Sequence, residues 1–340
     1  KADNLTAHLQ PQKDGWQLLL DSQQLKGEIV ERGDKAPLAV RFTHLYLPTA
    51  VVHSVVEKDA LADFDMRSIP ALDVQVDALY QGANHLGAWS FNTRPQAQGV
   101  LFDKLQLSLK GLHVNGQAGW QRSNGQVNSW YTGRLSGDNL SDVLLAWGFA
   151  PTVTSETFRS DVNMRWPGSP MALSLGKLSG DLDINFRKGQ LVTVDGGAQA
   201  LRVFGLLNFE SIGRRLRLDF SDLIGKGLAY DRIKGRLQVL NGVYRTDGTL
   251  SLSGPSSDIE LEGQLDLVNE KINAKMQVAL PLSTNLPLAA IAVGAPAIGG
   301  ALFVVDRLIG DRLARFASVT YHISGDWQNP EISLAKKDKK

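Results

Sequence analysis

Residues 248–280 alternate between apolar and polar side chains with a period of two. This alternation predicts β-strands that each have one apolar face and one polar face. Short runs at 253–255 and 268–271 interrupt it and indicate tight turns between antiparallel neighbours. The apolar positions are Leu250, Leu252, Ile259, Leu261, Leu265, Leu267, Ile272, Ala274, Met276, Val278 and Leu280. One side of these strands must therefore be covered.

The same pattern of strand and turn extends along most of the chain. We expect β-strands at 1–48, an irregular loop with one helical turn at 49–67, a main β-region at 68–285 and terminal strands at 318–334. The pattern predicts about twenty strands in total. The fold class is therefore mostly β, with one extensive antiparallel sheet and only short helical insertions.

Two short helices interrupt the main β-region. One is expected near 140–148, where Asn139 or Ser141 caps the amino-terminal end and Gly148 ends the helix. The other is expected near 197–209, where apolar side chains recur at helical spacing. Neither is long enough to form a layer over the sheet.

A third departure lies at 286–317, where we expect a helical hairpin. Residues 276–305 contain no charged side chain, and 286–305 alone have the length of a membrane span. Prolines and glycines within this stretch would break a helix, and 305–316 are amphipathic at helical spacing. A buried cap on the sheet, contact with a bilayer surface and a true span all remain open. The residues expected to contact a membrane are Leu286, Leu288, Ile291, Val293, Ile298, Leu302, Phe303, Leu308 and Ile309.

Three arrangements can cover the apolar face of so many strands. The sheet can fold onto itself as a sandwich. It can close into a membrane barrel with its apolar face outward. It can also curve into an open, U-shaped groove whose apolar lining is covered by acyl chains or another apolar guest. The periodicity of the sequence fits all three.

Composition and charge exclude some classes of function but do not assign one. Lys and Arg together number 36 against 35 for Asp and Glu, so the net charge of +1 gives no field that attracts nucleic acid. The chain has no cysteine, which excludes disulfides and thiolate metal sites. It starts at Lys1 without a signal-peptide pattern, so we expect it to be part of a longer protein. Residues 335–340 form a basic tail.

The sequence contains no recognisable catalytic or cofactor motif. Phosphate-binding, dinucleotide-binding, zinc-protease and serine-hydrolase patterns are all absent, and the six histidines lack ligand spacing. Three pairs of acidic residues lie two positions apart, at 63/65, 181/183 and 260/262. The last two pairs fall on the polar faces of predicted strands, where solvated side chains are expected. We therefore predict no enzyme, no catalytic residue, no metal site and no cofactor.

Three motifs resemble one known family. They are Trp-Pro-Gly-Ser-Pro at 166–170, the run from Val203 to Leu223, and Gly-Asp-Trp-x-x-Pro at 325–330. Together they resemble the carboxy-terminal region of the YhdP family, AsmA-like envelope proteins of Gram-negative bacteria, over about residues 70–334. The run 203–223 is the most specific of the three. The chain departs from the family pattern at 195–198 and at Gly213, which affects local turns only.

The resemblance implies a transport protein of the bacterial envelope. Such a protein is anchored in the inner membrane by an amino-terminal helix and crosses the periplasm as a curved β-sheet. It carries phospholipid toward the outer membrane in an apolar groove, and the segment 286–316 lies near the distal end. The implied partners are phospholipid acyl chains and the outer membrane, whereas protein partners are not identified. The family implies no catalytic residues.

The sequence and the resemblance together predict transport of phospholipid between the two membranes without catalysis. The alternatives are a structural or carbohydrate-binding β-sandwich, an outer-membrane barrel and a hydrolase that uses a carboxylate pair. The residues expected to line the groove are Leu182, Ile184, Phe186, Leu237, Val239, Leu250, Leu252, Ile259, Leu261, Leu265, Leu267, Ile272, Met276 and Val278.

Overall fold

The computed structural model describes residues 4–33, 36–47, 59–147, 149, 151–192, 228–255, 258–281, 303–309, 312–327 and 330–335. The strands are β1 (Thr6–Gln12), β2 (Gly15–Asp21), β3 (Leu25–Glu31), β4 (Leu38–Leu47), β5 (Leu72–Gln81), β6 (Asn84–Gln96), β7 (Gly99–Leu109), β8 (Leu112–Ser123), β9 (Gln126–Asp138), β10 (Thr157–Pro167), β11 (Ser179–Leu191), β12 (Leu228–Leu240), β13 (Val243–Ser253), β14 (Asp258–Asp266), β15 (Lys271–Pro281), β16 (Phe303–Ile309), β17 (Arg312–Asp326) and β18 (Glu331–Leu334). The helices are α1 (Leu140–Ala146) and three single 3-10 turns, η1 (Met66–Ser68), η2 (Pro170–Ala172) and η3 (Leu175–Lys177).

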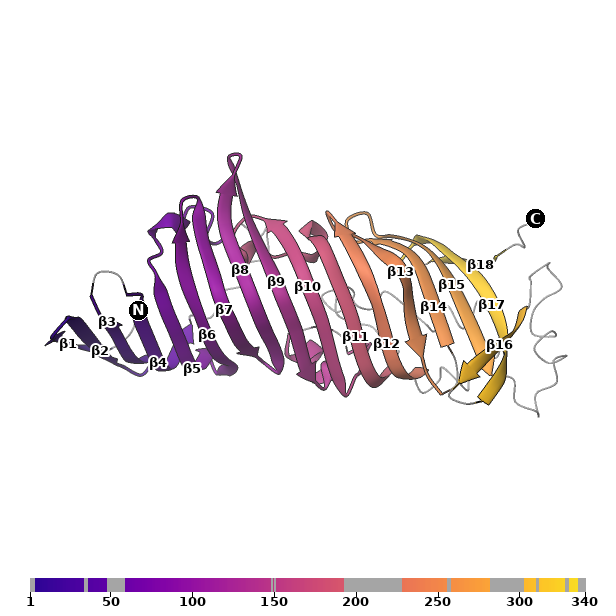
Figure 1. The fold of residues 1–340 in the computed structure, drawn as a ribbon, viewed down its shortest axis with the longest axis horizontal. Coiled ribbons are helices and arrows are strands. Elements are labelled where there is room, and N and C mark those ends of the chain that lie inside the picture. The colour runs from indigo at the N-terminus through magenta and orange to yellow at the C-terminus, as the bar shows by residue number, and fades with distance from the viewer. Residues whose placement is uncertain are drawn as a thin grey trace. The chain divides into compact units, whose positions relative to one another are not determined.

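The predicted fold class, a mostly β protein with an open antiparallel sheet, is confirmed. The 18 described strands are assigned to one sheet, and neighbours in sequence pair as antiparallel hairpins through β6–β9 and β12–β15 (Figure 1). The chain divides into two compact units. Unit 1 comprises residues 1–137 and 161–180, and unit 2 comprises 138–160 and 181–340.

Several hairpins close with two-residue turns whose residues both have positive φ. Asn124 and Gly125 have φ values of 52° and 77°, and Asn241 and Gly242 have 48° and 78°. These values define type I′ turns, whose twist matches that of the flanking strands. The turns fix the register, because Ser123 pairs with Gln126 and Leu240 pairs with Val243.

The pairing of β4 with β5 is the exception, because these strands run parallel from Leu38 opposite Leu72 to Leu47 opposite Gln81. A parallel pair cannot be joined by a tight hairpin, so the connection must return across one face of the sheet. Residues 59–70 are the described part of this connection and contain η1. The predicted irregular loop at 49–67 falls here, and its residues 49–58 lie outside the described residues.

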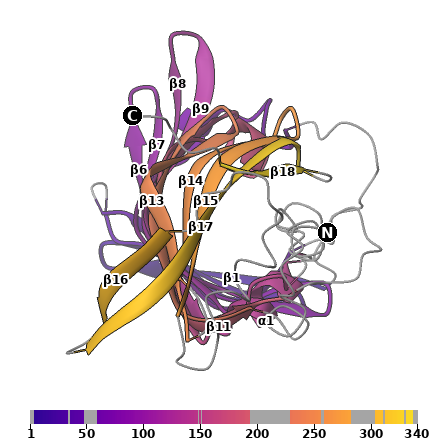
Figure 2. The same cartoon turned by 90° about the vertical axis from the view of Figure 1, so that its right-hand side faces the viewer.

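The strands of unit 2 are bent (Figure 2). The register shifts between Lys234 and Arg236 on β12 and between Arg245 and Leu250 on β13. Such irregularities bend a strand and increase its twist. Gly248, with φ of 73°, supplies the left-handed conformation that the second of these sites requires.

The predicted helical hairpin at 286–317 is wrong where the structure describes it. Residues 303–309 and 312–326 form β16 and β17, which pair antiparallel from Phe303 opposite Ser318 to Ile309 opposite Arg312. In the backbone register of this hairpin, Asp306 is paired with Arg315 across the two strands. Valine, isoleucine and phenylalanine favour this extended backbone. Residues 286–302 lie outside the described residues.

One short α-helix is present in the region where the sequence predicts its first helix. α1 begins after Asn139, whose backbone is left-handed with φ of 51°, and ends at Ala146, with Trp147 rather than Gly148 following the last helical residue. The helix predicted near 197–209 and the tail residues 336–340 lie outside the described residues. Within the described part of the chain, no helix combines the length and apolar character that crossing a membrane requires.

Candidate functional site

The apolar face of β12–β15 in unit 2 is formed by side chains that lie opposite one another on neighbouring strands. We refer to it as the unit-2 apolar face. The β-sheet register aligns its residues in three rows that cross the strands. The rows are Ile233–Leu252–Ile259–Val278, Leu250–Leu261–Met276–Tyr321 and Val239–Tyr244–Leu265–Ile272. Cross-strand contacts within such rows make the face a continuous apolar surface.

Burial on β15 follows the predicted alternation. Ile272, Ala274, Met276 and Val278 are buried, with Met276 only 3% exposed, whereas Asn273 and Lys275 are exposed and Gln277 is half-buried. These four side chains pack with Tyr321, Ile323 and Trp327 in one cluster. The cluster extends to the half-buried Ile259, Leu261, Leu265 and Leu267 on and just after β14.

Strand β14 behaves differently from β15. It is paired on both sides, with β13 and with β15, yet none of its residues is buried. Ile259, Leu261 and Leu265 on the apolar face are all half-buried. An interior strand of a packed sandwich is expected to bury its apolar side chains. The face of β14 is therefore only partly covered by the described residues.

The remaining predicted groove residues divide between a second cluster and more isolated positions. Ile184, Phe186, Leu250 and Ile259 pack against a cluster that contains the buried Leu252. Ile259 belongs to both clusters and links them. Leu182 and Leu237 are half-buried and Val239 is buried, but none of the three belongs to either cluster.

Several residues of these clusters were not predicted as site residues. They are Val153, Leu191, Leu228, Tyr230, Ile233, Ala274, Tyr321, Ile323, Trp327 and Ile332. Tyr321 and Ile323 alternate with polar neighbours, so the period of two could have assigned them to the same face. Val153 lies outside any named strand and bridges to Leu191, which no local pattern reveals.

Most of the predicted membrane-contact residues lie outside the part of the chain that the structure describes. Leu286, Leu288, Ile291, Val293, Ile298 and Leu302 lie outside the described residues. Phe303, Leu308 and Ile309 belong to strand β16 rather than to a helix. Contact of this segment with a membrane stays a prediction.

The polar side of unit 2 carries two of the acidic pairs as ordinary surface contacts. Asp183 accepts two hydrogen bonds from Arg236, at 3.0 and 3.1 Å, and this contact raises the pKa of Arg236. Glu262 accepts a hydrogen bond from Thr249 at 2.9 Å. In the third pair, in unit 1, Asp65 binds Arg67. All three carboxylates are thus engaged by neighbouring side chains.

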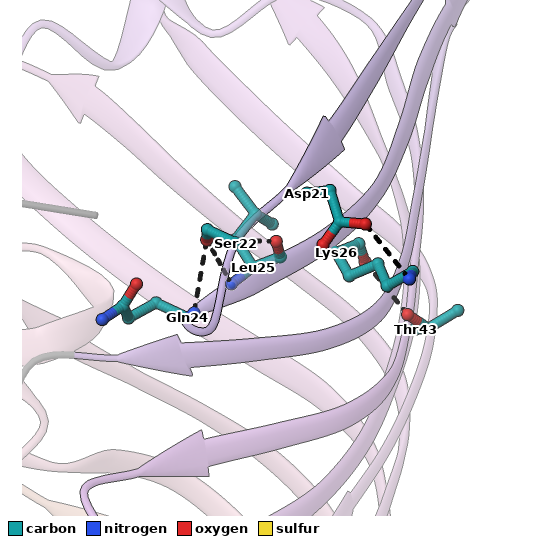
Figure 3. Close-up of polar contacts among 6 residues, drawn as sticks. All are labelled: Asp21, Ser22, Gln24, Leu25, Lys26 and Thr43. Atoms are coloured by element: carbon teal, nitrogen blue, oxygen red, sulfur yellow. Dashed lines mark hydrogen bonds and ion pairs between the residues drawn. The ribbon is translucent and has the colours of Figure 1, made fainter. Parts of the chain in front are cut away.

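Unit 1 has a shallow hollow of about 470 Å³ on strands β1–β5. Its lining mixes charges of both signs, and the cations are already paired. Lys26 lies 3.2 Å from Asp21 at the β2–β3 turn, where Ser22 Oγ accepts hydrogen bonds from the backbone amides of Gln24 and Leu25 (Figure 3). Arg41 binds Asp73. The carboxylates of Glu28 and Asp77 also line it, so the hollow does not favour an anionic ligand.

Burial on the unit-2 apolar face raises the pKa of Tyr321 to about 12. An unfolded tyrosine releases its proton near pH 10. Between pH 10 and 12 the unfolded state thus loses a proton that the folded state retains, so stability is fully present below pH 10 and falls as pH rises toward 12.

We expect Tyr321→Phe to reduce this alkaline loss. Urea unfolding at about pH 9 and about pH 11 measures it, because the stability difference between the two pH values should shrink in the variant. If the stability difference between the two pH values is the same in the variant, the alkaline loss does not come from Tyr321. Tyr244, whose pKa burial also raises to about 12, should retain its own share of the loss.

These features define a class: an open β-sheet protein whose apolar face is incompletely covered by its own described residues. Comparison with known proteins gives the family. The family described as YhdP protein matches residues 1–332, so the chain belongs to the YhdP family, as the motifs indicated.

A curated relative supports the same assignment. The "Intermembrane phospholipid transporter YhdP" of Escherichia coli (strain K12) is 27% identical over 214 residues, which are 63% of this chain and 17% of that protein. The chain therefore spans less than a fifth of the relative's length. No solved structure matches the chain.

Proposed function

We propose that this chain is a section of a phospholipid transporter and that acyl chains lie on the unit-2 apolar face. The E. coli relative carries the name of a phospholipid transporter, which gives the substrate class. The fourteen predicted groove residues all fall within unit 2. The proposal assigns them the role of an apolar solvent for lipid tails, without catalysis.

The observation that carries the proposal is the exposure of β14. Ile259, Leu261 and Leu265 lie on an interior strand, and each retains contact with solvent although neighbours pair on both sides. Exposed apolar area costs roughly 25 cal/mol per Å² relative to burial. An acyl chain along the three rows would remove this area from water. A sandwich core leaves no such surface, so the observation disfavours the β-sandwich alternative.

The chemistry of such a surface favours passage over tight capture. Leucine, isoleucine, valine and methionine bind methylene groups by dispersion and hydrophobic contact, which have little directionality. Each position along the rows is therefore nearly equivalent for a lipid tail. The proposal extends to movement of phospholipid across the periplasm, in a protein anchored in the inner membrane and directed toward the outer membrane.

The test is extraction of lipid from the purified chain. Organic extracts analysed by mass spectrometry are expected to contain phospholipid in an amount comparable to the protein. A chain that remains folded and yields no phospholipid, even after incubation with phosphatidylethanolamine vesicles, would contradict the proposal.

A further inference from the structure

Residues 59–70 form a strap in unit 1 that packs against apolar side chains of β7, β8 and β9. At one end, the carboxylate of Asp59 accepts hydrogen bonds from the backbone amide of Ser169 at 2.8 Å and from its hydroxyl at 2.5 Å. At the other end, the buried Thr93 on β6 donates to the carbonyl of Pro70 at 2.7 Å. The strap therefore runs from the loop after β10 to the start of β5.

The loop residues Gly168 and Ser169, next to Asp59, are themselves hydrogen-bonded to side chains of the sheet. Ser129 on β9 donates to the carbonyl of Gly168 at 2.9 Å, and the indole of Trp166 donates to the carbonyl of Ser169 at 2.9 Å. Ser169 is completely buried. These bonds give the Trp-Pro-Gly-Ser-Pro motif a physical role, because it forms the fixed side of the attachment.

Few side chains hold the middle of the strap to the sheet. Met66, 3% exposed, packs with Val100 on β7 and Trp120 on β8, and the half-buried Leu61 and Ile69 join this cluster. The ring of Phe64 stacks on Trp120 with 5.8 Å between centroids but is 45% exposed.

The backbone amides in the middle of the strap form hydrogen bonds within the strap rather than with the strands of the sheet. The amides of Ala62, Phe64, Ser68 and Ile69 donate to carbonyls of residues 59–66, within the strap itself. Displacing the strap from β7 and β8 would therefore break none of these four hydrogen bonds directly, but it would expose their amides to water. The attachment depends instead on side chains and on the carboxylate of Asp59.

Beneath the strap lies a polar atom without a partner. Trp120 is 2% exposed, and its indole Nε1 has no hydrogen-bond acceptor among the described residues. A buried N–H without an acceptor costs about 1–3 kcal/mol. The surrounding Val100, Phe102 and Val127 are apolar. A ligand with an acyl chain and one accepting oxygen complements this site.

We propose that the face under the strap is a second lipid site, which binds a glycerolipid with its acyl chain against Val100, Phe102 and Val127 and its ester carbonyl on the indole N–H of Trp120. The strap occupies this site in the absence of lipid and is held there by Asp59. Lipid and strap compete for the same apolar surface. This inference rests on the proposed function, since it concerns where lipid can bind along the same sheet.

The test uses the whole chain and vesicles of phosphatidylethanolamine and phosphatidylglycerol that contain a phosphatidylethanolamine with a diazirine in one acyl chain. After illumination, mass spectrometry maps the labelled peptides. Asp59→Ala is expected to raise labelling of residues 100–127 about fivefold, because it releases one end of the strap. Asp63→Ala removes an exposed carboxylate of the strap and is expected to leave labelling unchanged.

Trp120→Phe keeps an aromatic ring but removes the N–H. In the Asp59→Ala background it is expected to lower the labelling of 100–127 by about threefold, the value of one lost hydrogen bond. Its melting temperature is expected to fall, because phenylalanine fills less of the buried space than the indole does, so the labelling is the deciding measurement. A lower melting temperature with unchanged labelling would show a structural role only and would overturn the assignment of Trp120.

Labelling of β14 and β15 shows whether a negative result contradicts the strap inference alone or the proposed function as well. If those strands are labelled but Asp59→Ala and Asp63→Ala give equal labelling of 100–127, the strap inference is wrong and the proposed function stands. If no strand is labelled in any variant, the proposed function is wrong as well.

A measurement on the chain without substitutions tests the strap inference even if the variants fail to fold. Hydrogen exchange of peptides that cover residues 60–69 is expected to become faster when phospholipid vesicles are added. Unchanged or slower exchange in protein that has bound lipid would contradict displacement of the strap.

Discussion

Met276→Asp is expected to lower the amount of phospholipid that copurifies with the chain by at least about tenfold, which corresponds to about 1.4 kcal/mol in binding. Met276 lies in the centre of the unit-2 apolar face, in register with Leu261 on one side and Tyr321 on the other. An aspartate there places a charge without a partner in the buried cluster beneath the lipid tail, which costs several kcal/mol in an apolar environment. Mass spectrometry of extracts, normalised to protein, measures the loss.

The matched control places the same charge on the other side of the sheet. Gln264 on β14 faces the polar side, where Arg245 donates a hydrogen bond to it at 2.9 Å. Gln264→Asp should therefore leave bound lipid unchanged. Leu261→Asp adds a second test at a half-buried position, where an effect on folding is smaller than at Met276. Equal loss of lipid in Gln264→Asp would argue against the apolar face as the site.

Leu79→Ala is expected to lower the free energy of unfolding of unit 1 by about 2–5 kcal/mol, the cost of a large-to-small change in a packed core. Leu79 is 0% exposed and lies in a cluster with Val74 and Val76. Partly buried side chains from β4 and β6 pack against this cluster. The substitution therefore leaves a cavity that several strands enclose.

Urea denaturation followed by circular dichroism measures this effect. Leu9→Ala is the control, because Leu9 is 67% exposed on β1 and its loss should cost less than about 0.5 kcal/mol. The two units can unfold in separate transitions, so the midpoint of each transition is compared. Similar shifts in the two variants would show that the cluster around Leu79 is not the core of unit 1.

The strands of unit 2 are predictable because a period of two leaves little choice of face. Ile259, Leu261 and Leu265 alternate with acidic and amide side chains, and the register in the structure places them with Val278, Met276 and Ile272. The pattern specifies which side of a strand is apolar. It contains no information on what covers that side, so the periodicity by itself fits groove, sandwich and barrel equally.

The segment around 303–317 shows how the sequence can mislead. Arg307, Asp311 and Arg315 have the spacing of ion pairs on a helix, and this spacing predicts one. In the hairpin of β16 and β17, Arg315 instead lies opposite Asp306. Spacing along the chain cannot distinguish the two arrangements, because the partner strand also contributes charges.

The strap was not predictable from local pattern. Asp59 and Ser169 are 110 residues apart, and neither stands in a period that singles it out. The parallel pairing of β4 with β5, which obliges the chain to cross the sheet, has no signature in either strand. The Trp-Pro-Gly-Ser-Pro motif could be recognised as a family resemblance, but only the structure shows that it anchors a distant carboxylate.

The separation of Asp59 from Ser169 also bears on how the chain acquires its structure. Hairpins such as β8–β9 join neighbouring residues and can form quickly, whereas contacts between distant residues form slowly because a long loop must first close. During synthesis, β7 and β8 are complete well before residue 169 exists. The attachment of Asp59 to Ser169 is therefore expected to form late, after the hairpins of β6–β9.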